Sequence, residues 1–322
     1  MVVIKNKLVA FFQHPSLKSW VNILFLIAAT GFLVRHFYLS PLRLSDFESF
    51  LPLSISQVFY VFLVLVLLVG NYVLESLKWW WLSNEIQIRS FGTAFYDVIQ
   101  GVVIGFFTPF MLGDFVGRSM SFSTKYKPKV IFVNLYNGLA QIVVAIFFGT
   151  ISLGFWYFQI EIPYQKVVGG GFLLSLILFV LGLLVLFFFE NILFRFTYLR
   201  NMELVSLPFL LKLKVLVWTV VKNILYNLQY ILVFKIVDQQ VSVLTIVIGT
   251  NLLLLIKTFG GNLNFLSDLS LKQLVSIYFF KKYGVAEAAI VTATFFIWFI
   301  NICIPVVLGL FLVLLKNRKT WF

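Results

Sequence analysis

Long apolar runs separated by short polar breaks make up most of the chain. Several of them reach the ~20 residues that a helix needs to cross a bilayer. The runs cover approximately residues 19–39, 57–81, 94–112, 130–157, 167–189, 213–235, 243–259 and 285–315. A membrane barrel would show short stretches of alternating polarity instead. The pattern therefore predicts an all-α polytopic membrane protein in which residues 1–322 form a single integral-membrane domain.

The third run is interrupted and is followed by an acid and a base four residues apart. It stops at Thr108 and Pro109, and Gly113, Asp114 and Arg118 follow. Proline ends one helix, and a helix that starts after such a turn presents free N–H groups and a positive dipole end. We expect a re-entrant hairpin in which Asp114 caps the second helix and Arg118, on the same helix face, points into a polar cavity.

The seventh run repeats this arrangement in variant form. It breaks at Gly260, Gly261 and Asn262, and Asp268 and Lys272 follow, again four residues apart. Glycine suits such a turn because it permits unusual backbone dihedrals. The alternative for each acid–base pair is an ion pair at the membrane surface, which contributes little. The repetition favours a second hairpin with the same role.

The two broken runs divide the chain into pseudo-halves, about residues 1–160 and 161–322. If both runs return to the face they entered, about six full spans remain and the halves run in opposite directions, as in many transporters. Lysine and arginine placement supports the first hairpin, because a returning third run puts most of them inside, together with the N-terminus. The same count allows the seventh run to cross fully, so only the internal repeat argues for the second hairpin.

Composition and charge point to lipid as the partner. The chain is 61% hydrophobic and 11% charged, with 25 lysines and arginines against 12 acids and a net charge of +13. Because the basic residues gather at span ends, anionic lipid head groups are a more natural partner than nucleic acid. One cysteine and two histidines are too few for a disulfide framework and argue against a metal site. No cofactor is expected.

Other polar residues lie within predicted spans, among them Asp97, Asn137 and Lys222. Ionisable groups in a membrane are costly and usually face a cavity or a partner. An Asp97–Lys222 pair is one arrangement, and Asp97 is a candidate for proton coupling. For Asn137, hydrogen bonding between helices is the favoured alternative to substrate contact. At the end of the second run, Trp79 and the next two tryptophans predict an interface belt, from which Lys78 extends to head groups.

These motifs resemble those of the lysylphosphatidylglycerol synthase transmembrane family, also called the flippase-like domain family. Residues 75–82 resemble the tryptophan-rich end of its second span, and Thr108 to Arg118 its first signature. Residues 266–272 resemble the second signature but depart from it, with Lys272 where arginine is common. The resemblance covers about residues 10–315 and implies a flippase-like domain without the aminoacyltransferase domain that some members carry.

The resemblance implies movement of a phospholipid or a polyprenyl-linked lipid between leaflets of the cell (inner) membrane, with a cytoplasmic N-terminus. The expected substrate-binding residues are Thr108, Pro109, Gly113, Asp114, Arg118, Asp268 and Lys272. The alternatives are an integral-membrane transferase and a scaffold of a lipid or glycan pathway. The sequence contains no P-loop, zinc-protease or serine-hydrolase motif, so an enzyme is not expected. A homodimer, or an enzyme that supplies the lipid, is a compatible partner.

Overall fold

The computed structural model describes residues 54–108, 111–159, 162–194, 205–238, 240–260 and 265–318. These residues form helices, and none of them lies in a strand. The all-α prediction is therefore confirmed for this part of the chain. The predicted first run at 19–39 lies outside the described residues, as do Pro109, Gly261 and Asn262.

The described helices fall into long elements and short pairs. The long elements are α4 (Ile55–Asn84), α7 (Lys127–Tyr157), α8 (Ile162–Phe187) and α11 (Phe209–Val237). The last apolar run forms α14 (Glu287–Trp298), the π-helix η4 (Phe299–Cys303) and α15 (Ile304–Arg318). The two short pairs are α5 (Phe91–Phe106) with α6 (Leu112–Ser119), and α12 (Val243–Gly260) with α13 (Phe265–Phe280). The connecting elements are α9 (Phe189–Phe194), η2 (Thr124–Tyr126) and η3 (Lys281–Tyr283).

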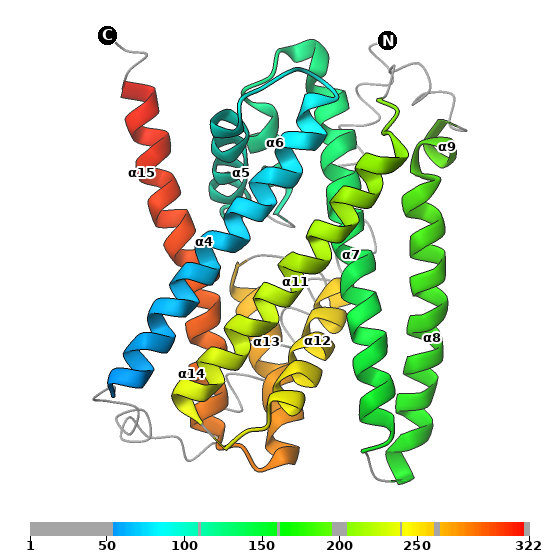
Figure 1. Ribbon diagram of the computed structural model, residues 1–322, viewed down its shortest axis with the longest axis vertical. Coiled ribbons are helices and arrows are strands. Elements are labelled where there is room, and N and C mark those ends of the chain that lie inside the picture. Colours follow the sequence, from blue (N-terminus) through cyan, green and yellow to red (C-terminus); the bar gives the residue numbers. More distant parts are fainter. Residues whose placement is uncertain are drawn as a thin grey trace.

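Two long helices cross the centre of the molecule next to each other. Figure 1 shows α4 and α11 running obliquely side by side, and the two helices pack together. The α5–α6 pair lies toward one end of the molecule and the α12–α13 pair toward the opposite end. Helices α7 and α8 pack on one side, and α14 and α15 lie on the other. The two broken runs of the sequence thus form short helix pairs at opposite ends of one bundle.

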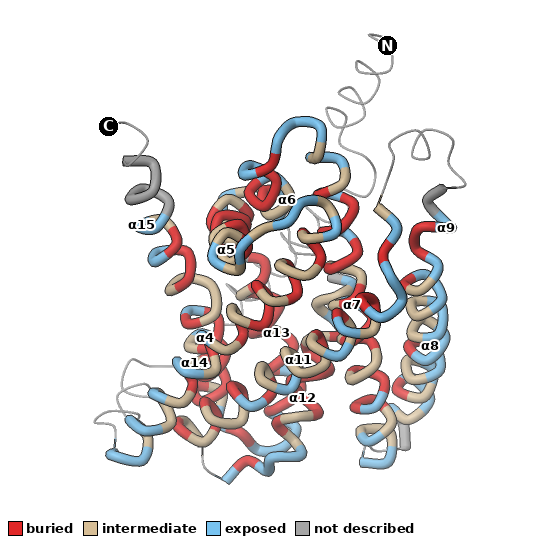
Figure 2. The backbone as a smooth tube through the Cα atoms, turned by 45° about the horizontal axis from the view of Figure 1, so that its top comes forward, coloured by how far each residue is buried: buried red, intermediate tan, exposed pale blue. Residues whose placement is uncertain are grey.

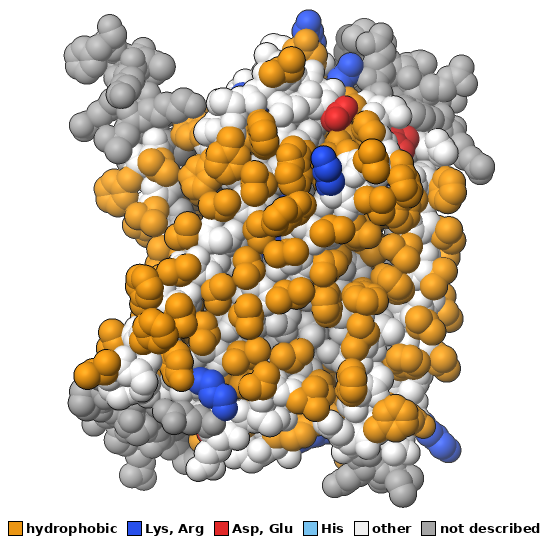
Figure 3. Space-filling model, viewed as in Figure 1, with side chains coloured by type: hydrophobic (Ala, Val, Ile, Leu, Met, Phe, Trp, Pro, Cys, Tyr) orange, Lys and Arg blue, Asp and Glu red, His pale blue; other side chains and the backbone are white. Residues whose placement is uncertain are grey.

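The surface and the length of the helices suit a lipid environment. Four described segments are long and apolar enough to cross a bilayer, judged by length and composition: Ile55–Asn84, Thr124–Tyr157, Tyr164–Phe187 and Glu287–Leu312. Helix α8 exposes much of its surface, as Figure 2 shows, and its exposed side chains are largely leucine, isoleucine and valine. On the face in Figure 3, most charged side chains lie toward the two ends, and hydrophobic side chains cover much of the broad middle. These features support a membrane protein.

Small residues bring α5 and α6 close together. A Cβ atom at Gly117 would lie 2.6 Å from the Gln100 carbonyl oxygen and 2.6 Å from the Gly101 Cα atom. A Cβ atom at Gly113 would collide with the Ile104 carbonyl oxygen. Only glycine leaves room for such an approach between two helix backbones. These two glycines therefore determine the position of α6, and of its charged residues, relative to α5.

Candidate functional site

The acid and the base on α6 form the pair that their spacing predicts. Arg118 donates from Nε to both carboxylate oxygens of Asp114, at 3.0 and 3.1 Å. Asn134 of α7 donates to the same carboxylate at 2.9 Å. The Arg118 side chain is 6% exposed and that of Asp114 is 21% exposed, so this is a largely buried ion pair and not the surface pair that was the alternative.

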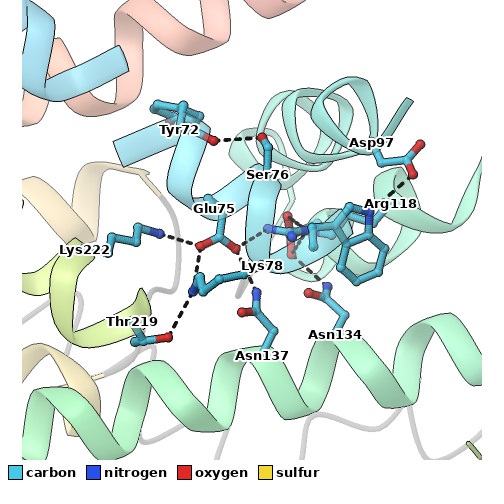
Figure 4. A network of polar contacts seen from close by, with 12 residues as sticks. Tyr72, Glu75, Ser76, Lys78, Asp97, Arg118, Asn134, Asn137, Thr219 and Lys222 are labelled. Atoms are coloured by element: carbon cyan, nitrogen blue, oxygen red, sulfur yellow. Dashed lines mark hydrogen bonds and ion pairs between the residues drawn. The ribbon is translucent and has the colours of Figure 1, made fainter. Parts of the chain in front are cut away.

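Glu75 on α4 is the centre of the surrounding network (Figure 4). Its Oε1 atom accepts from Arg118 Nη2 at 3.0 Å and from Asn137 Nδ2 at 2.8 Å. Its Oε2 atom accepts from Lys222 Nζ at 2.7 Å and lies 3.1 Å from Lys78 Nζ. One carboxylate, 6% exposed, thereby joins side chains from α4, α6, α7 and α11. We call these residues, with Asp114 and Asn134, the Glu75 network.

Lys78 and Trp79 are buried, which corrects the prediction of a snorkelling lysine and, for Trp79, the prediction of a place in an interface belt. Both side chains are 0% exposed. Lys78 donates to Thr219 at 3.2 Å besides pairing with Glu75. Trp79 donates to Asp97 at 3.3 Å, and the Arg118 guanidinium lies over its ring at 5.1 Å. Because α5 and α11 pack against α4, these side chains face the protein interior and not the head groups.

Asp97 belongs to a separate cluster beside the Glu75 network. It pairs with Arg89 at 2.7 Å and accepts from the Ser121 hydroxyl at 2.5 Å. Burial lowers the pKa of the Arg89 guanidinium, and the Asp97 carboxylate opposes that shift. The sequence left open an Asp97–Lys222 pair, but the structure gives each residue another partner, with Lys222 on Glu75. Asp97 therefore ties α5 to the loops on either side of the α5–α6 pair.

The second helix pair carries its own buried network. Asp268 on α13 pairs with Lys272 one turn later at 2.7 Å, as the spacing predicts. Its other oxygen pairs with Lys257 of α12, also at 2.7 Å. Asp268 and Lys272 are 5% and 2% exposed. We call these three residues the Asp268 network.

In the turn before α6, a free backbone N–H is bound by the side chain of Thr108 and not, as we expected, by that of Asp114. The Gly113 N–H donates to the Thr108 hydroxyl at 2.7 Å, and that hydroxyl donates to the Gly105 carbonyl at 3.1 Å. The N-cap position of α6 is Met111, in the left-handed region with φ 53°, and no side chain caps it there. Asp114 is free to bind Arg118 because threonine satisfies the backbone of the turn. The prediction that Asp114 caps this helix is therefore wrong.

The structure separates the predicted site residues into groups. The Glu75 network contains Asp114, Arg118, Asn137 and Lys222. The Asp268 network contains Asp268 and Lys272. Thr108 and Gly113 shape the turn, and Asp97 lies in its own cluster. Arg118 and Lys272 thus belong to two distinct networks.

Two central residues were not among the predicted site residues. Glu75 and Lys257 both lie inside apolar runs, where an ionisable side chain is costly and usually functional. That signal alone could have identified them. Glu75 was instead interpreted together with the neighbouring tryptophans as the end of a span.

Comparison of the chain with sequence models of known families, with characterised proteins and with solved structures finds no match. The resemblance to the flippase-like domain family therefore stays a prediction that rests on the motifs.

Proposed function

We propose that this protein moves an anionic, phosphate-bearing lipid between the two leaflets of a membrane. The observation that carries the proposal is the Glu75 network, which gathers three cations and two carboxylates, most of them buried, in a bundle with an apolar surface. Charged groups in such surroundings are expensive, and they mark substrate or ion pathways in membrane proteins. Arginine and lysine side chains are the usual partners of phosphate groups.

The arrangement of the helix pairs supports transport over simple binding. The α5–α6 and α12–α13 pairs lie toward opposite ends, and each carries a buried network with an acid four residues before a base. We propose that they are re-entrant hairpins of an inverted repeat, which enter from opposite faces. Rocking of one half against the other would then expose the lipid head group first to one leaflet and then to the other.

The topology and the family complete this proposal. With the ends of α5–α6 on the inside, the basic loops beside it and the end of α15 fall on the cytoplasmic face, in agreement with the positive-inside rule. We place the protein in the cell (inner) membrane on this basis. Membership of the lysylphosphatidylglycerol synthase transmembrane family is part of the same proposal.

Transport can be tested with purified protein in liposomes that contain a fluorescent phosphatidylglycerol. A membrane-impermeant quencher reports how fast the labelled lipid leaves the protected leaflet. We expect the wild type to accelerate this exchange and Arg118→Ala to slow it at least about tenfold, because a buried charge contact is lost. Arg118→Lys retains the charge without the guanidinium fork and should be intermediate. Lys125→Met, at an exposed lysine, should match the wild type.

The same preparation separates transport from catalysis. Analysis of the lipids after incubation with candidate donors shows whether a new product forms. Unchanged lipids together with faster exchange support a translocator. If the wild type moves no lipid and consumes a donor instead, the transport proposal fails and the transferase alternative takes its place.

A further inference from the structure

Both buried networks hold one more cation than carboxylate. In the Glu75 network, Lys78, Arg118 and Lys222 face the carboxylates of Glu75 and Asp114. In the Asp268 network, Lys257 and Lys272 share a single carboxylate. Within the ion pairs of the described residues, each network therefore carries one surplus positive charge. An uncompensated buried charge is unfavourable unless a ligand of opposite charge joins it.

One lysine in each network remains accessible. The side chains of Lys222 and Lys257 are 27% and 26% exposed, whereas Lys78, Arg118 and Lys272 are at most 6% exposed. Lys222 lies on α11 and Lys257 on α12, two helices that pack together. Asn227 of α11 donates to Asn251 of α12 at 3.0 Å, and because the two helices run antiparallel, Lys222 and Lys257 lie five and six residues from that contact on the same side of it. The accessible cation of each network therefore lies on one of two neighbouring helices, α11 and α12.

The two lysines also have hydrogen-bond donors without an acceptor among the described residues. An ammonium group has three donors. Among the described residues, Lys222 bonds only Glu75 and Lys257 only Asp268. The Glu75 network holds a further unused donor, because Arg118 Nη1 is buried without a hydrogen-bond partner in the described part of the chain. An anion with several acceptor oxygens would satisfy donors that the described part of the protein leaves open.

We propose that Lys222 and Lys257 together bind the terminal phosphate of a lipid that ends in a phosphate monoester. A phosphate monoester carries about −1.5 to −2 charges at pH 7 and three strong acceptor oxygens. That charge matches the two surplus cations, whereas the phosphodiester of an ordinary phospholipid carries a single charge. This inference rests on the proposed function, since it specifies the head group that the translocator accepts. It also moves the phosphate contact from Arg118 and Lys272 to the two exposed lysines.

Binding of two matched lipids tests the inference without transport. Dioleoyl phosphatidic acid ends in a monoester, and dioleoyl phosphatidylglycerol has the same acyl chains but a diester. Titration of each into the purified full-length protein in uncharged detergent, followed by native mass spectrometry, gives both dissociation constants. We expect the wild type to prefer phosphatidic acid by at least about tenfold, roughly the effect of one charge contact.

The variants show whether the two lysines carry this preference. Lys222→Met and Lys257→Met should each remove it, and Lys257→Arg should retain it. Loss of Lys257 leaves Asp268 paired with Lys272, so this variant is expected to fold. Lys125→Met is the matched control and should bind like the wild type.

The outcomes separate this inference from the proposed function. Equal affinity for the two lipids, or an undiminished preference in both methionine variants, overturns the inference even if the liposome assay shows transport. Conversely, a preference that depends on the lysines in a protein that moves neither lipid supports the site and rejects translocation. A folding defect in one methionine variant leaves the other methionine variant and the wild-type comparison to decide.

Discussion

At the scale of single residues, Glu75 is the most connected charged side chain of the described structure. Its carboxylate forms ion pairs with Lys78, Arg118 and Lys222 and accepts a hydrogen bond from Asn137. A buried ion pair is not necessarily more stable than an apolar pair, but removal of one partner leaves the others charged and desolvated. Because three cations depend on this carboxylate, its neutralisation should cost more than the loss of any one of its contacts.

Glu75→Gln tests this dependence. Glutamine is nearly isosteric but neutral, so we expect the substitution to destabilise the protein by about 3 kcal/mol or more, the range for a broken buried ion pair. The measurement is thermal unfolding of the purified variant in detergent. Glu287→Gln is the control, because Glu287 pairs with the half-exposed Lys281 and its loss should cost under about 1 kcal/mol. Equal unfolding temperatures of the two variants would contradict the central role of Glu75.

The sequence predicted the acid–base pairs on α6 and α13 but not what they bind. Helical spacing is a local property, and it correctly places Asp114 beside Arg118 and Asp268 beside Lys272. Glu75 contacts Arg118 across 43 positions of the sequence, which no local period can show. The prediction that Lys78 reaches head groups was wrong for the same reason: only the packing of other helices decides which end of a span is covered.

At the scale of elements, backbone contact between α5 and α6 positions Arg118. A methyl group at Gly117 would meet backbone atoms of Gln100 and Gly101, which cannot move aside as a side chain would. The α6 helix would therefore have to shift away from α5 and carry Arg118 away from Glu75.

Gly117→Ala should for this reason both destabilise the protein and slow lipid exchange. We expect a loss of about 1–3 kcal/mol, as for overpacking in a tight core. Gly138→Ala on α7 is the matched control, because a Cβ atom there has no neighbour within 4 Å and alanine favours the helix. Thermal unfolding and the liposome assay measure both variants. If the two alanine variants behave alike, close packing of α5 and α6 does not position the network.

The last apolar run contains an irregularity next to the Glu75 network. Pro305 has no N–H to donate to the Asn301 carbonyl, four residues earlier, and the helix passes through the π-helix η4 at this point. The Tyr72 hydroxyl donates to that carbonyl at 3.1 Å. Tyr72 lies on α4 three residues before Glu75, so this bond links the irregular segment to the helix that carries the network.

Tyr72→Phe should cost about 1 kcal/mol, because the Asn301 carbonyl loses the donor of a partly buried hydrogen bond. In a Pro305→Ala background the same substitution should cost less, since alanine at this position supplies an N–H to that carbonyl. A double-mutant cycle of thermal unfolding measures the difference. Additive effects of the two substitutions would show that Tyr72 does not replace the donor that proline lacks.

The apolar runs predicted the helices well, because burial in lipid or protein requires a closed hydrogen-bond pattern along each run. Their irregular parts were harder to predict. The π-helix lies where Tyr72 of a distant helix donates to the Asn301 carbonyl, and in the α6 turn Thr108 is the polar side chain that reaches a free N–H group. At η4 the contact comes from a distant helix, whereas at the α6 turn it is local and joins Thr108 to Gly113.

At the scale of the whole molecule, the repeat in the sequence corresponds to two short helix pairs toward opposite ends of the bundle (Figure 1). The sequence could suggest this arrangement but not the placement of Lys222 and Lys257 on two helices, α11 and α12, that pack together. The position of the pairs has a direct consequence for topology. If α5–α6 is a re-entrant hairpin, the loops before and after it lie on one face of the membrane, and the loops flanking α12–α13 lie on the other.

Single cysteines in these loops measure this topology. In a Cys303→Ala background, cysteines replace Ile88 and Lys125 around the first pair, and Gln240 and Lys281 around the second; all four positions are exposed. A membrane-impermeant maleimide applied to intact cells should label only Gln240→Cys and Lys281→Cys, whereas all four should react after permeabilisation. Labelling of Ile88→Cys and Lys125→Cys from opposite sides means that α5 crosses the membrane fully. Labelling of Gln240→Cys and Lys281→Cys from opposite sides means the same for α12, and either result removes the inverted repeat on which alternating access depends.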